Sequence, residues 1–139
     1  MVNNQIMLIA EYEEEVEIKE GVTRIGLSAF KDCTTLKHVA IPNTILKIGI
    51  SAFSGCSSLA SIVIPESVET IEGSAFEGCI ALTQVDILGT VNKINQGTFE
   101  GCSSLASIII PEGVTNIGNS AFSGCSSLAS IIIPEGVTN

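Results

Sequence analysis

The chain has 139 residues, which suits one ordinary domain, and it is 45% hydrophobic but only 4% aromatic. Its formal net charge is −9, from 15 acidic and 6 basic residues. Nucleic acid and anionic membrane surfaces both attract clustered Lys and Arg, so this balance predicts no nucleic-acid partner. Any core must be built mainly from Ile, Val, Leu and Ala.

Residues 1–15 precede the regular pattern of the chain and are predicted to form an N-terminal cap or flanking segment. The apolar stretch 6–10 is shorter than a signal-peptide core and has no basic residue before it. No part of the chain approaches the roughly 20 apolar residues that a membrane helix needs. We therefore predict no membrane insertion and see no signal peptide, and the localisation stays open.

From residue 16 to residue 139 the chain is built of 23-residue repeats. The period is kept by every phenylalanine and every cysteine, and by five leucines as well. The two ladders are Phe30, Phe53, Phe76, Phe99 and Phe122, and Cys33, Cys56, Cys79, Cys102 and Cys125. A fixed internal period is the signature of a solenoid, in which stacked units bury faces that a single unit leaves exposed. We predict an array of about five repeats.

Each repeat is predicted to contain a short strand, a turn and one short helical turn. Val39 and Ile41 lie two residues apart, which places both side chains on the inner face of a strand. A proline ends this strand in four of the repeats. The later stretch 51–56 predicts the helical turn, with Ser51 as its N-cap and Gly55 just past its end.

The sequence of residues 105–125, LASIIIPEGVTNIGNSAFSGC, resembles the BspA-like leucine-rich repeats, also called the Treponema-type class. The resemblance covers residues 16–139 and rests on the recurring Ile-Pro, Ile-Gly, Ala-Phe and Cys landmarks. It implies an elongated, curved leucine-rich-repeat solenoid of mainly short β-strands, and many such proteins are surface-associated and implicated in adhesion. Glu72, Leu88, Asn95 and Thr98 depart from the pattern and are expected to loosen local turns without breaking the frame.

The last repeat stops part way through a coil, without a C-terminal capping sequence. Its inward side chains Ile131, Ile133 and Val137 are therefore expected to be exposed to water beside unpaired strand edges. Such edges recruit other chains. We predict self-association of the isolated chain through this uncapped coil.

The residue pattern predicts neither an enzyme nor a metal or cofactor site. A thiol nucleophile needs a histidine close enough to activate it, and the single histidine, His38, points away from the inner face that Val39 occupies. The cysteines recur once per coil, whereas zinc sites typically use close pairs of cysteines. An odd number of thiols in equivalent positions favours free thiols over disulfides.

Two functions remain open: a recognition module for a protein or glycan ligand, as the resemblance implies, and a purely structural spacer or fragment of a longer repeat array. The module would use the outward residue between the two inward residues of each strand, together with polar neighbours. Exposed aliphatic rows often mark interaction sites, although branched residues also suit any strand. The candidate binding residues are His38, Ala40, Val63, Gln84, Asp86, Ile109 and Ile132.

Overall fold

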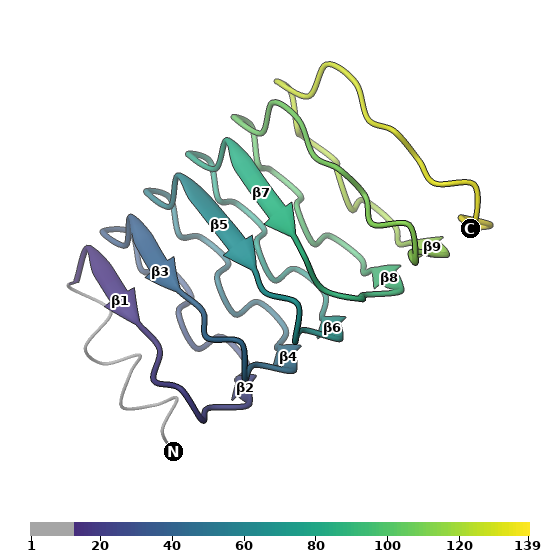
Figure 1. Cartoon of the computed structure of the whole chain (residues 1–139). Coiled ribbons are helices and arrows are strands. Elements are labelled where there is room, and N and C mark those ends of the chain that lie inside the picture. Colours follow the sequence, from purple (N-terminus) through teal and green to yellow (C-terminus); the bar gives the residue numbers. More distant parts are fainter. Residues whose placement is uncertain (1–12) are drawn as a thin grey trace.

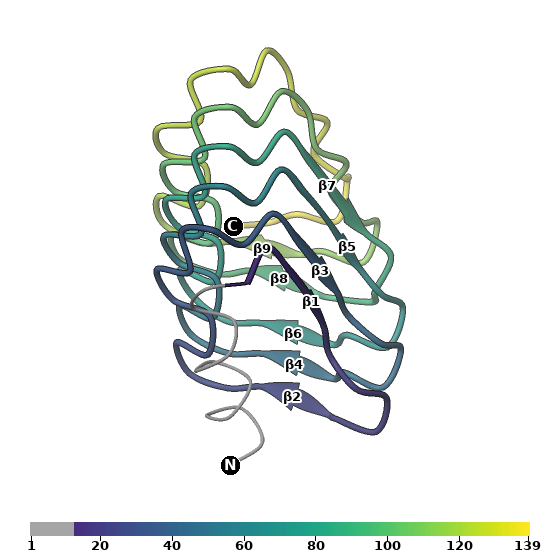
Figure 2. The ribbon, with the colours of Figure 1, turned by 90° about the vertical axis from the view of Figure 1, so that its left-hand side faces the viewer.

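The computed structural model of the chain describes residues 13–139. The chain winds into a solenoid whose coils stack side by side (Figure 1), and Figure 2 shows the stack running from the first coil to the last. The predicted solenoid of 23-residue repeats is confirmed. Of the predicted N-terminal cap, residues 1–12 lie outside the described residues, so that prediction stays untested.

Short parallel strands form two faces of the solenoid. The first face carries β1 (Glu15–Glu17), β3 (His38–Ala40), β5 (Ser61–Ile64) and β7 (Gln84–Ile87). The second face carries β2 (Arg24–Ile25), β4 (Lys47–Ile48), β6 (Thr70–Ile71), β8 (Lys93–Ile94) and β9 (Asn116–Ile117). Hydrogen-bonded pairs join β1 to β3 and β5 to β7 on the first face, and β2, β4 and β6 as well as β8 and β9 on the second. An isolated bridge between Ile109 and Ile132 continues the first face.

The register of every strand pair follows the repeat, because each residue lies opposite the residue 23 positions later. Val16 pairs with Val39 in this way. Along β5 the side chains of Ile62 and Ile64 are buried, whereas Ser61 and Val63 are exposed. This alternation confirms the predicted inner face of the strands and follows from the two-residue period of an extended chain.

The core is built around the phenylalanine ladder. Phe30, Phe53, Phe76 and Phe99 are fully buried, and Phe122 in the last ring position is half-buried. Neighbouring rings stack nearly parallel, with centroids 5.1 to 5.6 Å apart. Each ring between two others therefore loses contact with water on both of its faces.

The predicted helical turn is wrong, because the segment forms successive tight turns instead. The N–H of Ser54 donates to the carbonyl of Ser51 over 3.1 Å, but the N–H of Phe53 donates to Ala75 in the next coil over 2.8 Å. Donors that are used between coils cannot form a continuous helical ladder. Ser51 has φ 56°, a left-handed conformation unlike an N-cap, and Gly55 follows with φ 76°. The equivalent serines with positive φ are Ser28, Ser74 and Ser120.

Two of the departures from the repeat are accommodated by hydrogen bonds. Leu88 stands where other repeats have proline, and its N–H donates to Ile64 over 2.9 Å, a bond that proline cannot make. Thr98 is fully buried in place of alanine, and its hydroxyl donates to the carbonyl of Asn95 over 2.7 Å. Buried polar groups are tolerated when they are hydrogen-bonded in this way.

The last coil is partly uncovered. Ile133 is 46% exposed, and Ile131 and Val137 are half-buried, whereas their counterparts one coil earlier are buried. Self-association through this coil stays a prediction. Residues 13–139 contain no helix that is long and apolar enough to span a membrane.

Candidate recognition surface

The outer strand face is the surface formed by the outward side chains of β1, β3, β5 and β7 and of the bridged residues Ile109 and Ile132. Its most exposed aliphatic side chains are Val63 at 51%, Ile109 at 82% and Ile132 at 80%. Val63 lies opposite Asp86 in the strand register, and Ile109 lies opposite Ile132. The outward residue at the middle of each strand thus forms a row across the coils, made of Ala40, Val63, Asp86, Ile109 and Ile132. Four of these five side chains are aliphatic, and the carboxylate of Asp86 lies between Val63 and Ile109.

The polar candidates lie on the same face. His38, Ala40 and Gln84 are exposed, and Asp86 is half-buried. The side-chain amide of Gln84 donates to Oδ2 of Asp86 over 3.2 Å, which fixes the two polar side chains beside each other. All seven residues predicted from the sequence thus lie on the outer strand face, although His38 and Ala40 occupy a different coil from Gln84 and Asp86.

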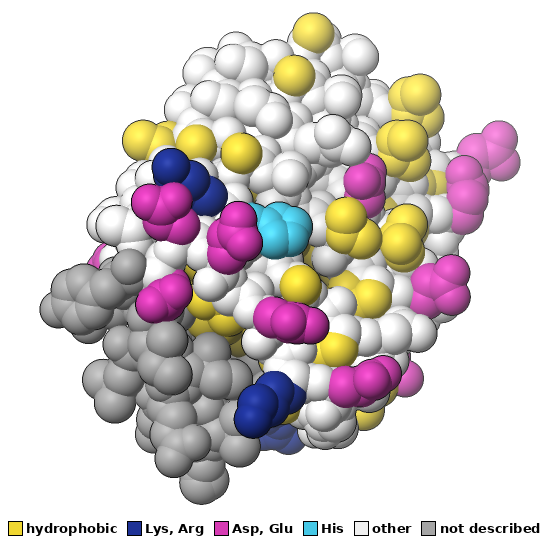
Figure 3. Space-filling model, turned by 60° about the vertical axis from the view of Figure 1, so that its left-hand side comes forward, with side chains coloured by type: hydrophobic (Ala, Val, Ile, Leu, Met, Phe, Trp, Pro, Cys, Tyr) yellow, Lys and Arg dark blue, Asp and Glu magenta, His cyan; other side chains and the backbone are white. Residues whose placement is uncertain are grey.

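An acidic edge adjoins the histidine and was not among the predicted site residues. Glu15 lies opposite His38 and Glu17 opposite Ala40 in the register of β1 and β3. Figure 3 shows acidic side chains next to the histidine on one side and hydrophobic side chains next to it on the other. The 23-residue period applied backwards from His38 points to Glu15, so the signal was present in the sequence.

The cysteine ladder lies inside the solenoid, away from this face. The thiol of Cys56 donates to the carbonyl of Phe30 over 3.1 Å, and Cys79 makes the same bond to Phe53 over 3.2 Å. Burial, reinforced by the neighbouring thiol of Cys33, raises the pKa of Cys56 to about 12. Thiols of this kind stay protonated at neutral pH and are poor nucleophiles.

None of the five cysteines forms a disulfide. The part of the chain that the structure describes also contains no cluster of three or more His, Cys, Asp or Glu side chains suited to a metal ion. The thiols of Cys56, Cys79, Cys102 and Cys125 each donate to the phenylalanine carbonyl of the preceding coil.

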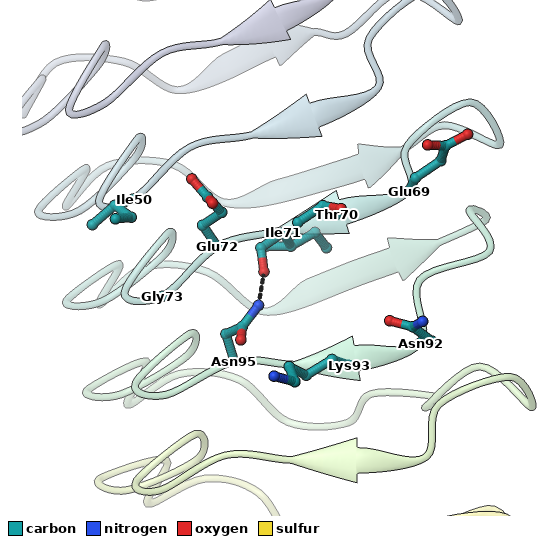
Figure 4. A pocket seen from close by; sticks show the side chains of 9 residues that line it. All are labelled: Ile50, Glu69, Thr70, Ile71, Glu72, Gly73, Asn92, Lys93 and Asn95. Carbon is teal, nitrogen blue, oxygen red and sulfur yellow. Dashed lines mark hydrogen bonds between the residues drawn. The ribbon is translucent and has the colours of Figure 1, made fainter.

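A second feature lies on the other face, between β6 and β8. A hollow of about 380 Å³ is lined by polar side chains that include Glu69, Glu72, Lys93 and Asn95 (Figure 4). Two of these residues, Glu72 and Asn95, depart from the repeat pattern, but that pattern does not predict the hollow itself.

Comparison with known proteins places the chain among repeat proteins. The family profile described as BspA type Leucine rich repeat region matches in six copies over residues 23–139. No curated protein sequence matches the chain. The T. pallidum leucine-rich repeat protein TpLRR is similar in structure, with 32% identity and a TM-score of 0.83, over 87% of this chain and 59% of that chain.

Two further solved structures are similar. The pneumococcal vaccine antigen PcpA has 25% identity and a TM-score of 0.81, over 90% of this chain and 31% of that chain. A leucine rich cell surface protein from Faecalibacterium prausnitzii has 25% identity and a TM-score of 0.58, over 95% of this chain and 56% of that chain. The chain spans less than two thirds of the length of each of the three structures. Because the family profile covers most of its residues, the chain belongs to the BspA-type leucine-rich repeat proteins.

Proposed function

We propose that the protein is a non-catalytic recognition module that binds a protein partner through its outer strand face. The observation that carries the proposal is the row of exposed aliphatic side chains at Val63, Ile109 and Ile132, which are 51%, 82% and 80% exposed. Ile109 and Ile132 are neighbours in the register, Asp86 separates them from Val63, and exposed apolar surface with a polar rim commonly marks an interaction site. The branched side chains are stiff and stand on stacked coils, so binding would cost little side-chain entropy.

The character of the surface favours a protein over a glycan at this face. The exposed side chains Val63, Ile109 and Ile132 carry no group that could hydrogen-bond to the hydroxyl groups of a sugar. The aliphatic row suits an apolar patch on a protein, and the acidic edge beside His38 suits basic side chains next to that patch. Opposite charges at the rim of an interface steer association and fix its register.

Adhesion at a cell surface is the setting that we propose for this recognition. Its support comes from relatives, because the similar F. prausnitzii protein is named a cell surface protein and PcpA is named a vaccine antigen. A structural spacer without binding activity is the rival function. The two functions differ in what happens when the outer strand face is altered.

The triple variant Val63→Thr, Ile109→Thr and Ile132→Thr tests the proposal. Threonine keeps the β-branch, and the three side chains are exposed, so the thermal midpoint should change little. Binding to a protein captured by the parent chain from host-cell extract should weaken at least about tenfold, measured by surface plasmon resonance.

A matched control replaces three exposed aliphatic residues elsewhere, Leu27, Leu46 and Ile80, which are 72%, 45% and 52% exposed. Their change to threonine should leave the captured protein bound as tightly as by the parent. Two results would show that the outer strand face is ordinary strand surface. The parent chain would capture no protein, or the triple variant at Val63, Ile109 and Ile132 would bind as tightly as the parent.

A further inference from the structure

The solenoid has one junction on its second face where the backbone ladder is interrupted. At the next junction the N–H of Gly118 donates to the carbonyl of Ile94 over 2.7 Å, as a regular coil requires. Between β6 and β8, in the part of the chain that the structure describes, no backbone hydrogen bond replaces this pattern. Instead, the side-chain amide of Asn95 donates to the carbonyl of Ile71 over 2.6 Å.

The interruption coincides with a substitution at Asn95. The equivalent residues in the regular coils, Gly49 and Gly118, bring their own N–H groups up to the preceding strand. A built Cβ on Gly49 would lie only 2.9 Å from the backbone of the preceding coil, yet Glu72 at the equivalent position still donates its N–H to the carbonyl of Ile48 over 2.9 Å. At Asn95 the side-chain amide takes the place of the backbone N–H and reaches the carbonyl of Ile71 across this junction.

A missing side chain leaves space at the same junction. Gly73 stands where the repeats before and after it carry Ile50 and Gln96. The hollow of about 380 Å³ opens at this place, within the range of roughly 300–1,000 Å³ that is usual for ligand pockets. The concave site thus lies where a side-chain bond from Asn95 replaces the backbone bond and where Gly73 carries no side chain.

The lining offers hydrogen-bond donors and acceptors together. Glu69 and Asn92 lie toward one end of the hollow, and Glu72 and Asn95 lie toward the other (Figure 4). Carboxylates accept, the ammonium group of Lys93 donates, and the amides do both. A ligand whose groups can each donate and accept would be matched along the whole length of the site.

The charges of the site cancel. Glu72 is paired with Lys47, whose Nζ lies 3.4 Å from Oε2, and the remaining charged residues of the lining are one carboxylate, Glu69, and one ammonium group, Lys93. An anion would meet the two carboxylates, and a cation would meet the ammonium group, so neither is favoured. Ile50 is 50% exposed at the edge and offers an apolar contact.

We propose that this hollow binds a neutral saccharide unit. Hydroxyl groups both donate and accept, which fits the mixed lining, and the C–H face of an uncharged sugar ring fits Ile50. The hollow lies on the second face, whereas the proposed protein-binding residues lie on the outer strand face. A negative test of one proposed site therefore leaves the other proposal unaffected.

Titration of the chain with maltose, cellobiose, lactose and chitobiose, followed by amide chemical shifts in ¹H–¹⁵N NMR spectra, tests the proposal. At least one of these disaccharides at millimolar concentration should shift amides within 69–73 and 92–95. The variant Asn95→Gly restores the residue of the regular coils and should close the hollow, weakening binding at least about tenfold. Gly73→Gln copies the next coil and should obstruct the hollow, with the same result.

The control is Asn119→Ala, which removes an exposed amide from the neighbouring coil outside the hollow and should leave sugar binding unchanged. The outer-face triple variant should also bind sugar as the parent does, whatever its effect on protein binding. The proposal is overturned if no disaccharide shifts these amides, or if both hollow variants bind as the parent does. It is equally overturned if a charged sugar or a peptide shifts the amides and the neutral disaccharides do not.

Discussion

Replacing Phe76 by alanine is expected to lower the free energy of unfolding by about 3–5 kcal/mol. The ring is fully buried and stacks between Phe53 and Phe99, with centroids 5.3 and 5.6 Å away. Its removal opens a cavity in the middle of the ladder. The backbone hydrogen bonds that join neighbouring coils limit how far the structure can collapse around this cavity. Urea denaturation followed by circular dichroism measures the loss.

The same substitution at the end of the ladder provides the control. Phe122 is half-buried and stacks on a described ring on one side only, so Phe122→Ala should cost clearly less than Phe76→Ala. Ser61→Ala on the outer strand face should change the midpoint little, because this side chain is exposed. Equal losses for all three variants would contradict the assignment of inner and outer positions.

Alkaline pH is expected to destabilise the fold through the buried thiols. Burial raises the pKa of Cys56 and of Cys102 to about 12, whereas an unfolded thiol titrates near 8.5. A group with a raised folded pKa contributes its full stability below the unfolded pKa and loses it as the pH rises toward the folded value. Each of these thiols should therefore lower the free energy of unfolding by about 1.4 kcal/mol per pH unit between the two pKa values.

Urea titrations in reducing buffer at a series of pH values from neutral into this alkaline range would measure the slope. The variant Cys56→Ser and Cys102→Ser carries hydroxyl groups that do not titrate in this range, so its slope should be shallower than that of the parent. The native parent at neutral pH should also react slowly with a thiol reagent at both positions. Equal alkaline slopes for parent and variant would contradict a protonated, buried thiol ladder.

The strand register could be predicted from the sequence because one number sets it. With a period of 23 residues, Val39 must lie opposite Val16 in the strand register, and Ile132 must lie opposite Ile109, as the structure shows. The alternation of aliphatic residues within each strand then decides which side chains face inward. The phenylalanine and cysteine ladders follow from the same two facts, and all five rings and thiols occupy the expected positions.

The turn after each second-face strand could not be predicted in the same way. Ser51 and Gly55 carry the local signature of a short helix, and nothing near them in the sequence opposes it. The competing partner of Phe53 is the carbonyl of Ala75, 22 residues later. Stacking of the coils supplies this bond, so a rule that weighs neighbouring residues alone predicts the wrong element.

The sequence indicates the position of the hollow between β6 and β8 but does not predict its shape. Asn95 was recognisable as a departure from glycine, but its consequence depends on the carbonyl of Ile71 in the preceding coil, which accepts the side-chain amide. The same kind of departure at Leu88 had the opposite effect and added a backbone bond between coils. A break in a repeat pattern therefore indicates which coil differs from the others. The structural effect of the substitution depends on its contacts with the neighbouring coil.

Site-specific photo-crosslinking tests the central claim, that the outer strand face binds a protein partner, most directly. A photoreactive phenylalanine at Ser107 would stand exposed on the outer strand face beside Ile109, and one at Asn119 would stand exposed after β9 on the second face. With the protein captured by the parent chain, crosslinks should form from position 107 and be absent from position 119. Crosslinks from position 119 alone, or from neither position while the partner stays bound, would contradict the assignment of the outer strand face as the recognition surface.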